Sequence, residues 1–449
     1  MTLDIYLWLG FMVSSCAYLV FFMVRRGLTL GMLTFTFFLL LPISMYPFAF
    51  SVENTSAVAA YLFAGILEQL PRALYITLLS VALFLAGFAA QRLLPGQQTR
   101  QPQRQTVLKT SLYLFETYFW TWRAMLISLA VMTVLFVVLI GLGVPYGSGQ
   151  AFAFEVVSLR PLLNIWAALC TTYLVIMTCH AFHSMRPGPW VVLGIAFVLS
   201  LLTGQRAASV LPVVFGGGLC LIASRVRVGI AQGLGLVVGG AVALVAALVI
   251  SGLRNGVALD DLISSDVIAE ALSTELLYGN QFSDLRDFAW ILSGFDGNYV
   301  LGKTYLAGFT PFVPSYLSDF RTEWGWGRWS TDVAGINDYA HGGLRPPIFG
   351  EIFFNFGYPG LLVLCPLIGF LFARLLATLE QVLVPRTGDR RLAVVAFGFL
   401  VATLSINIFF TSGFFKVLVH IGLLFVNVVA VFFVDFLFPR RTPRLQRAN

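Results

Sequence analysis

Two arginines lie where apolar stretches end, and their side-chain chemistry suits phosphate. Arg206 closes the stretch 203–206 between two apolar runs, and Arg254 closes the stretch 252–254 after another. A guanidinium group presents a planar set of donors that matches phosphate oxygens. We therefore interpret Arg206 and Arg254 as a candidate clamp for a phosphate or pyrophosphate. The alternative is that each arginine only anchors a helix end at a membrane surface.

A histidine, an arginine and a carboxylate follow further along the chain, at His341, Arg345 and Glu351. A histidine can take a proton from an attacking hydroxyl near neutral pH, so His341 is the first candidate for a general base. Glu351 is a supporting or alternative carboxylate, and Arg345 is a secondary phosphate contact. In the alternative reading, His341 only hydrogen-bonds its own loop and Glu351 pairs with Arg345 or Arg206.

Aromatic and basic residues alternate with glycines over residues 320–329, which include Trp324, Trp326 and Arg328. An indole ring offers a broad apolar face together with a polar N–H, which suits sugar rings as well as a membrane interface. We predict that Trp324, Trp326 and Tyr305 contact sugar, and that Arg328 is a second auxiliary phosphate contact. The alternative is an aromatic belt at the membrane surface.

The polar part of the sequence lacks the usual metal-binding patterns. It contains no Asp-x-Asp pair of the sugar-nucleotide type, no HExxH and no set of Cys and His residues at ligand spacing. A serine nucleophile elbow is also missing. We expect any chemistry here to be metal-independent and to need no cofactor.

The composition defines the elements that must position these residues. The chain has 449 residues, of which 58% are hydrophobic and 11% are charged, with a mean hydropathy of +0.86. Soluble domains carry roughly 25% charged residues, so we expect an all-α polytopic membrane protein. Eleven spanning segments are predicted: 5–24, 28–50, 73–94, 124–143, 160–182, 189–204, 207–223, 229–251, 348–377, 391–411 and 414–438.

The basic residues predict the orientation of these segments. Eighteen of the 28 Lys and Arg residues fall in alternate short connections and in the C-terminal tail. The positive-inside rule places those connections in the cytoplasm, with the N-terminus outside and the C-terminus inside. The first segment lacks a basic n-region, so we expect it to remain as a helix. This charge distribution explains the net charge of +7 without nucleic acid as a partner.

Three regions follow from this pattern: a bundle of about eight helices over 1–250, a large extracytoplasmic loop over 251–347, and three helices with a tail over 348–449. Within the loop, 260–277 and 283–292 have helical spacing of apolar residues, and Ser283 is a candidate N-cap. The remainder after Gly294 lacks clear periodicity. Gly216-Gly-Gly and Gly235-x-x-x-Gly239 favour close helix packing.

An ordered set of short motifs resembles the Wzy-type polymerases, which are O-antigen and exopolysaccharide repeat-unit polymerases of the bacterial inner membrane. The motifs are Thr203-Gly-Gln-Arg206, Gly252-Leu-Arg254, Gly302-Lys-Thr-Tyr305, Phe312-Val-Pro314 and Arg345-Pro-Pro-Ile-Phe-Gly-Glu351-Ile-Phe-Phe-Asn355-Phe-Gly357-Tyr-Pro-Gly360. The stretch around His341-Gly-Gly-Leu also resembles the branch that polymerises enterobacterial common antigen.

This resemblance implies a GT-C-like fold and glycosyl transfer on the periplasmic face. The substrates would be oligosaccharides linked to undecaprenyl pyrophosphate, and the protein would be surrounded by membrane lipids. A chain-length-regulating co-polymerase would be a partner. Two other functions stay open. An O-antigen ligase would share the fold, and a transporter or flippase of lipid-linked oligosaccharides would place polar residues deep within several helices. A scaffold without catalytic activity is a third alternative.

Overall fold

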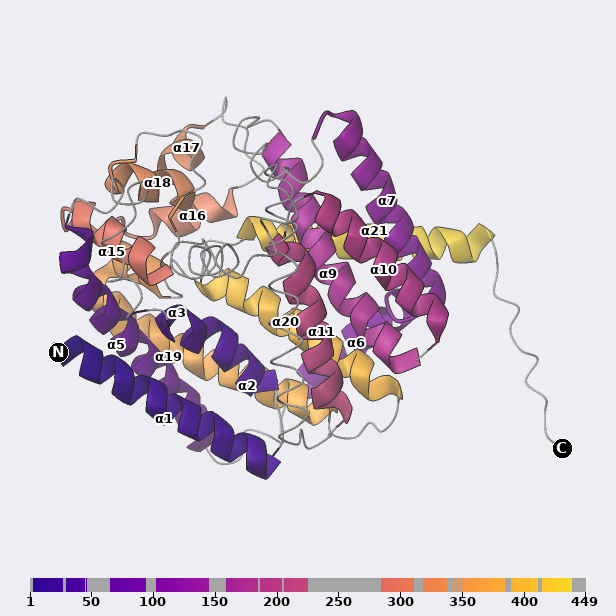
Figure 1. Ribbon diagram of the computed structural model, residues 1–449. Coiled ribbons are helices and arrows are strands. Elements are labelled where there is room, and N and C mark those ends of the chain that lie inside the picture. The colour runs from indigo at the N-terminus through magenta and orange to yellow at the C-terminus, as the bar shows by residue number, and fades with distance from the viewer. Residues whose placement is uncertain are drawn as a thin grey trace, which may run out of the picture.

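We describe the protein from a computed structural model (Figure 1). In the part of the chain that the structure describes, the regular secondary structure is helical. That part comprises residues 3–26, 30–44, 46, 65–93, 102–144, 159–184, 186–203, 206–224, 284–310, 318–336, 343–344, 346, 349–383, 389–410 and 414–437. The predicted segment 229–251, the predicted loop helix 260–277 and the pair Gly235 and Gly239 lie outside these residues.

Five described helices are long and apolar enough to cross a membrane. An α-helix rises 1.5 Å per residue, so about 20 apolar residues cover a hydrocarbon core of about 30 Å. The chain is therefore a multi-pass helical membrane protein, as its composition predicts. The five helices are α1 (Leu3–Arg26), α5 (Ile66–Leu93), α7 (Trp122–Gly141), α9 (Arg160–Ser184) and α19 (Gly350–Leu383).

Further helices occupy other predicted segments: α10 (Pro187–Leu202), α11 (Arg206–Ser224), α20 (Asp389–Phe410) and α21 (Phe414–Leu437). The predicted segment 28–50 is helical over 30–44, as α2 (Leu30–Phe35), a π-helical turn (Thr36–Leu40) and α3 (Leu41–Ser44). These 15 residues extend about 22 Å, less than a hydrocarbon core. A helix of hydrophilic composition, α6 (Pro102–Tyr118), precedes α7.

Glycines bring the spanning helices into backbone contact. A Cβ atom added to Gly87 of α5 would lie 1.9 Å from the carbonyl oxygen of Pro366 in α19, and one added to Gly369 would lie 2.0 Å from the carbonyl oxygen of Phe84. Likewise, a Cβ on Gly216 would meet Thr178 of α9 at 2.6 Å. Small residues are typical of such contacts in membranes, so the predicted packing role of Gly216 is confirmed.

Helix α19 is broken and folds back on itself at Gly357, whose φ of 64° is left-handed. The rings of Phe349 and Phe372 both lie beside Phe84, at centroid distances of 5.7 and 6.1 Å. In a straight helix those two residues would be about 35 Å apart. The predicted span 348–377 is thus a short helical segment, 350–356, followed by a longer one that still suffices to cross a membrane. We call this pair the α19 hairpin.

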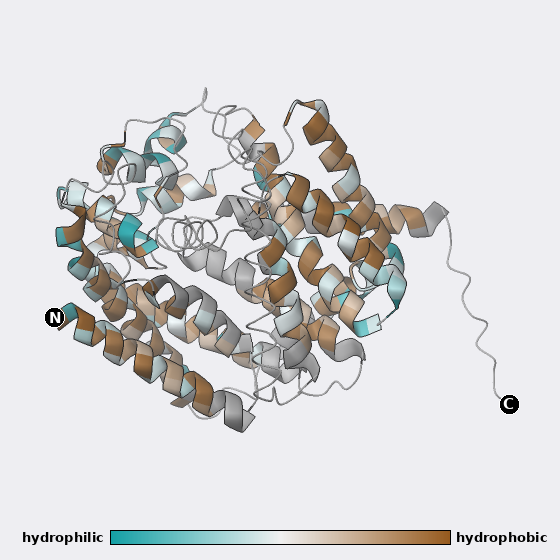
Figure 2. Cartoon of the chain, viewed as in Figure 1, coloured by the Kyte–Doolittle hydropathy of each residue, from teal (hydrophilic) through white to brown (hydrophobic). Residues whose placement is uncertain are grey.

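Four short helices, drawn in salmon to orange in Figure 1, follow residue 283 in the described part of the chain: α15 (Asp284–Gly294), α16 (Lys303–Phe309), α17 (Phe320–Trp324) and α18 (Trp326–Val333). Figure 2 shows them as a mixture of teal, white and brown, in contrast to the largely brown helix α7. The predicted helix 283–292 is confirmed by α15. After Gly294, where the sequence lacks clear periodicity, the described residues form three more helices. Gly302 and Gly325 are the N-caps of α16 and α18, and these helices are too short to show a clear helical period in the sequence. Phe288 of α15 packs edge-to-face on Phe353 and Phe354 of the α19 hairpin.

Candidate functional site

The α19 hairpin and α16 meet in a buried polar cluster. The Thr304 hydroxyl donates to Glu351 Oε1 at 2.7 Å, and the Asn355 amide Nδ2 donates to Thr304 Oγ1 at 2.7 Å and to the Glu351 carbonyl at 2.8 Å. All three side chains are buried, with exposed fractions of 0–1%. Glu351 and Asn355 share one face of the short segment because they are four residues apart. We call Thr304, Glu351 and Asn355 the polar clasp.

Backbone hydrogen bonds tie the same two elements together. Val300 donates its N–H to the Phe354 carbonyl at 3.2 Å, and Leu301 donates to the Asn355 carbonyl at 3.0 Å. These carbonyls are available because the helix ends at Gly357 and because Pro359 has no N–H. Gly357 has φ 64° and ψ −158°, a conformation that essentially only glycine adopts, and it ends the short segment two residues before Pro359.

Tyr305 follows Thr304 in the sequence and brings a phenolic hydroxyl to this region. Its ring stacks on Phe356, with centroids 6.4 Å apart and planes 11° apart. The residue is half-buried, but its hydroxyl oxygen is buried and makes no hydrogen bond in the described part of the chain. Burial and then the negative charge of Glu351 raise the pKa of Tyr305 well above its usual value near 10, so the phenol stays protonated.

The residues around the clasp pack against one of the apolar helices, α5. Phe349, two residues before Glu351, packs on Phe84 within the span Ile66–Gln91, and the added Cβ of Gly360 would meet Ile352 across the hairpin. Glu351 therefore lies next to α5, near the start of the broken helix α19. A carboxylate buried among apolar helices is costly unless it is hydrogen-bonded, and it marks a candidate functional site.

The two tryptophans that we predict to contact sugar lie close to this site, but both also make contacts within the protein. Trp326 donates its indole N–H to the Leu344 carbonyl at 2.9 Å and packs on Trp329 and Phe354. Trp324 lies under the ammonium group of Lys303, 3.7 Å from the ring centroid. Arg328 forms an ion pair with Asp332 at 2.9 Å on the surface of α18.

The predicted phosphate and base residues are mostly outside the described part of the chain. Arg206 begins α11, although its side chain is not described. His341, Arg254 and Arg345 fall outside the described residues. Of the predicted site residues, the structure brings Glu351, Tyr305 and the two tryptophans, Trp324 and Trp326, into one region, and the position of the arginine clamp stays a prediction.

Sequence reasoning missed two members of the clasp, Thr304 and Asn355, although both lie in quoted motifs. The signal was the Glu351–Asn355 spacing of one helical turn inside an otherwise apolar stretch. It also missed Asn427 of α21, which is fully buried. Asn427 bonds the Tyr118 carbonyl at 2.9 Å, the Tyr173 hydroxyl at 3.2 Å and the Ser128 hydroxyl at 3.3 Å.

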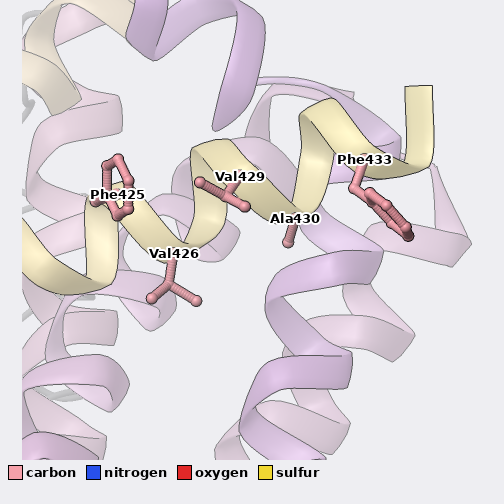
Figure 3. A pocket seen from close by; sticks show the side chains of 5 residues that line it. All are labelled: Phe425, Val426, Val429, Ala430 and Phe433. Carbon is pink, nitrogen blue, oxygen red and sulfur yellow. The ribbon is translucent and has the colours of Figure 1, made fainter. Parts of the chain in front are cut away.

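A surface hollow of about 330 Å³ lies along α21 (Figure 3). Its lining is entirely apolar and consists of Phe425, Val426, Val429, Ala430 and Phe433. It offers no group that binds phosphate or sugar hydroxyls, so the polar clasp is the better candidate for chemistry. Among the described residues, no group of three His, Cys, Asp or Glu side chains is placed to hold a metal ion.

Comparisons with protein-family models, with curated proteins and with solved structures found no match. The fold and the site therefore define a class, a multi-pass helical membrane protein with a buried carboxylate at a helix break.

Proposed function

We propose that this protein is a glycosyltransferase of the polysaccharide-polymerase type, with a GT-C-like fold, in a bacterial inner membrane. The observation that carries the proposal is the polar clasp. It joins the motifs Gly302–Tyr305 and Glu351–Gly357, which are about 50 residues apart in the sequence, around one buried carboxylate. Both motifs belong to the set that resembles the Wzy-type polymerases.

The proposed reaction transfers a growing glycan from undecaprenyl pyrophosphate to a lipid-linked repeat unit on the periplasmic face. A hydroxyl oxygen of the acceptor sugar forms a bond to the anomeric carbon of the donor. The bond from that carbon to the pyrophosphate oxygen breaks, and undecaprenyl pyrophosphate leaves with the bonding electron pair. A base removes the proton of the acceptor hydroxyl.

Each residue has a proposed role in that reaction. Arg206 and Arg254 bind the pyrophosphate and stabilise the charge that develops on it, with Arg345 and Arg328 as secondary contacts. His341 is the first candidate for the base and Glu351 the second, while Tyr305, Trp324 and Trp326 contact sugar.

Separate alanine substitutions of Arg206 and Arg254 test the proposal. Each should shorten or abolish the polymer in cells that contain wild-type amounts of the protein. The matched control is Arg72→Ala, because Arg72 is exposed and its guanidinium bonds Gln69 on the same helix turn. Polymer of normal length and yield in both test variants would overturn the assignment.

An O-antigen ligase of the same fold is distinguished by what accumulates on deletion of the gene. Loss of a ligase leaves long polymer on the lipid carrier, whereas loss of a polymerase leaves single repeat units attached to lipid A core.

The structure also gives an observation that favours the transporter alternative. Many secondary transporters build their substrate sites at breaks in membrane helices, and Glu351 lies in a broken helix. Purified protein in liposomes discriminates between the two functions. Movement of a fluorescent lipid-linked saccharide between leaflets, without any lengthening of the glycan, would favour transport.

A further inference from the structure

One polar atom of the clasp, Asn355 Oδ1, is buried and has no hydrogen-bond partner in the described part of the chain, and the same holds for the hydroxyl of Tyr305, which follows Thr304 of the clasp. Asn355 has an exposed fraction of 0%. Buried polar atoms in native proteins nearly always have a partner, and leaving one unpaired is costly. These two atoms therefore point to a ligand that supplies the missing bonds.

The orientation of the Asn355 amide is fixed by its other contacts. Its Nδ2 lies 2.8 Å from the backbone carbonyl of Glu351, an atom that can only accept a hydrogen bond. The amide nitrogen must face that carbonyl, so the unpaired atom is the oxygen. Asn355 consequently presents an acceptor and requires a donor.

Tyr305 presents the complementary group. Its phenol is protonated, because burial and the charge of Glu351 oppose ionisation, so it can donate. The neighbours of the two residues are in contact: Thr304, which precedes Tyr305, bonds the Asn355 amide, and the Tyr305 ring stacks on Phe356, which follows Asn355. The negative charge of Glu351 also acts on the Tyr305 hydroxyl.

A hydroxyl group satisfies both atoms at once, since it donates through its hydrogen and accepts through its oxygen. We propose that Asn355 Oδ1 and the Tyr305 hydroxyl bind one hydroxyl group beside Glu351. Two sources share this chemistry: a water molecule, or a hydroxyl of a sugar. The sugar source rests on the proposed function, whereas the hydroxyl site itself does not.

The proposed site would bring a hydroxyl group close to the carboxylate of Glu351, which a purely structural carboxylate would not require. A hydroxyl group held between Asn355 and Tyr305 would lie next to the Glu351 carboxylate. Oε1 of that carboxylate already accepts a hydrogen bond from the Thr304 hydroxyl, with 2.7 Å between the two oxygen atoms. If that hydroxyl belongs to the acceptor sugar, Glu351 is close to the proton that the transfer reaction must remove.

The test is Tyr305→Phe in the purified full-length chain, with thermal unfolding as the readout. Removing a buried hydroxyl that has no partner leaves the Tm unchanged or raises it, because a desolvation cost disappears. Removing one that binds a hydroxyl group lowers the Tm, which is the result expected. The matched control is Tyr358→Phe, because Tyr358 belongs to the α19 hairpin and its ring contacts Phe353, but the residue is exposed, so the Tm of this variant should match the wild type.

Titration with glucose and with N-acetylglucosamine separates the two sources. A sugar hydroxyl as the ligand predicts that the saccharide raises the Tm of the wild type more than that of Tyr305→Phe, since only the wild type retains both contacts. Equal rises in a variant that starts from a lower Tm assign the site to water. An unchanged or higher Tm for Tyr305→Phe without saccharide overturns the proposal, whatever the outcome of the polymerisation assay.

Discussion

The backbone N–H of Leu301 donates to the carbonyl oxygen of Asn355 at 3.0 Å, the carbonyl that Pro359 leaves without its helical partner. This bond shows how the helix break and the loop depend on each other. The short segment 350–356 ends because Gly357 turns the chain, and its last carbonyls then accept from the loop before α16. That docking places Thr304 against Glu351.

Gly357→Ala should destabilise the protein by about 2 kcal/mol or more. Gly357 has φ 64° and ψ −158°, a region that essentially only glycine adopts, and holding another residue there costs about 1–3 kcal/mol. The new Cβ would also lie 2.7 Å from Cζ of Tyr299, and overpacking of this kind costs about 1–3 kcal/mol. Denaturant titration of the purified protein measures the change. Gly422→Ala on α21 is the control, because nothing lies within 4 Å of its Cβ position. Equal stability of the two variants would contradict the role of Gly357.

Thr304→Val should lower the free energy of unfolding by about 2–4 kcal/mol, because it removes the donor to Glu351 and the acceptor of Asn355 while keeping the side-chain shape. Thr304→Ser retains the hydroxyl and should recover most of that loss. The comparison is internal, since both variants change the same position. A serine variant as unstable as the valine variant would show that packing of the threonine methyl, not the hydroxyl, holds α16 in place.

The class of protein and several helices follow from the sequence because they depend on local pattern. Apolar runs of 18 or more residues predict the membrane helices, and the spacing of apolar residues after Ser283 predicts α15. The break at Gly357 does not follow in the same way. A run interrupted by a few glycines and by Pro359 and Pro366 still averages as a single apolar helix, and membrane helices tolerate both residue types.

The polar clasp depends on tertiary contact, which no local pattern encodes. Thr304 and Glu351 are 47 residues apart in the sequence, and their meeting requires both the fold-back of α19 and the docking of α16. Asn427 illustrates the same limit, because an isolated asparagine in an apolar run does not identify its partners on other helices. The sequence motifs named Glu351 and Tyr305, but only the fold relates them to each other.

Asn427→Leu should destabilise the helix bundle by about 1–2 kcal/mol. Hydrogen bonds between membrane helices average about 0.6 kcal/mol each, and Asn427 takes part in bonds to Ser128, Tyr173 and the Tyr118 carbonyl. The control is Asn164→Leu, an asparagine of α9 that is exposed. Unfolding of both variants in detergent measures the difference. If Asn164→Leu loses as much stability as Asn427→Leu, burial of the amide is not the cause.

Arg328 and Asp332 offer a test that separates a surface ion pair from a pyrophosphate contact. Their side chains are 34% and 47% exposed, so the pair should contribute only about 0.2–1 kcal/mol to stability, and less at high salt. Both Arg328→Ala and Asp332→Ala should therefore fold normally. If Arg328 also binds pyrophosphate, Arg328→Ala should reduce polymer length while Asp332→Ala leaves it unchanged, because only the arginine carries the positive charge. Polymer length in cells with matched protein levels measures this. Equal effects of the two variants would remove Arg328 from the proposed site and leave it as one half of a surface ion pair.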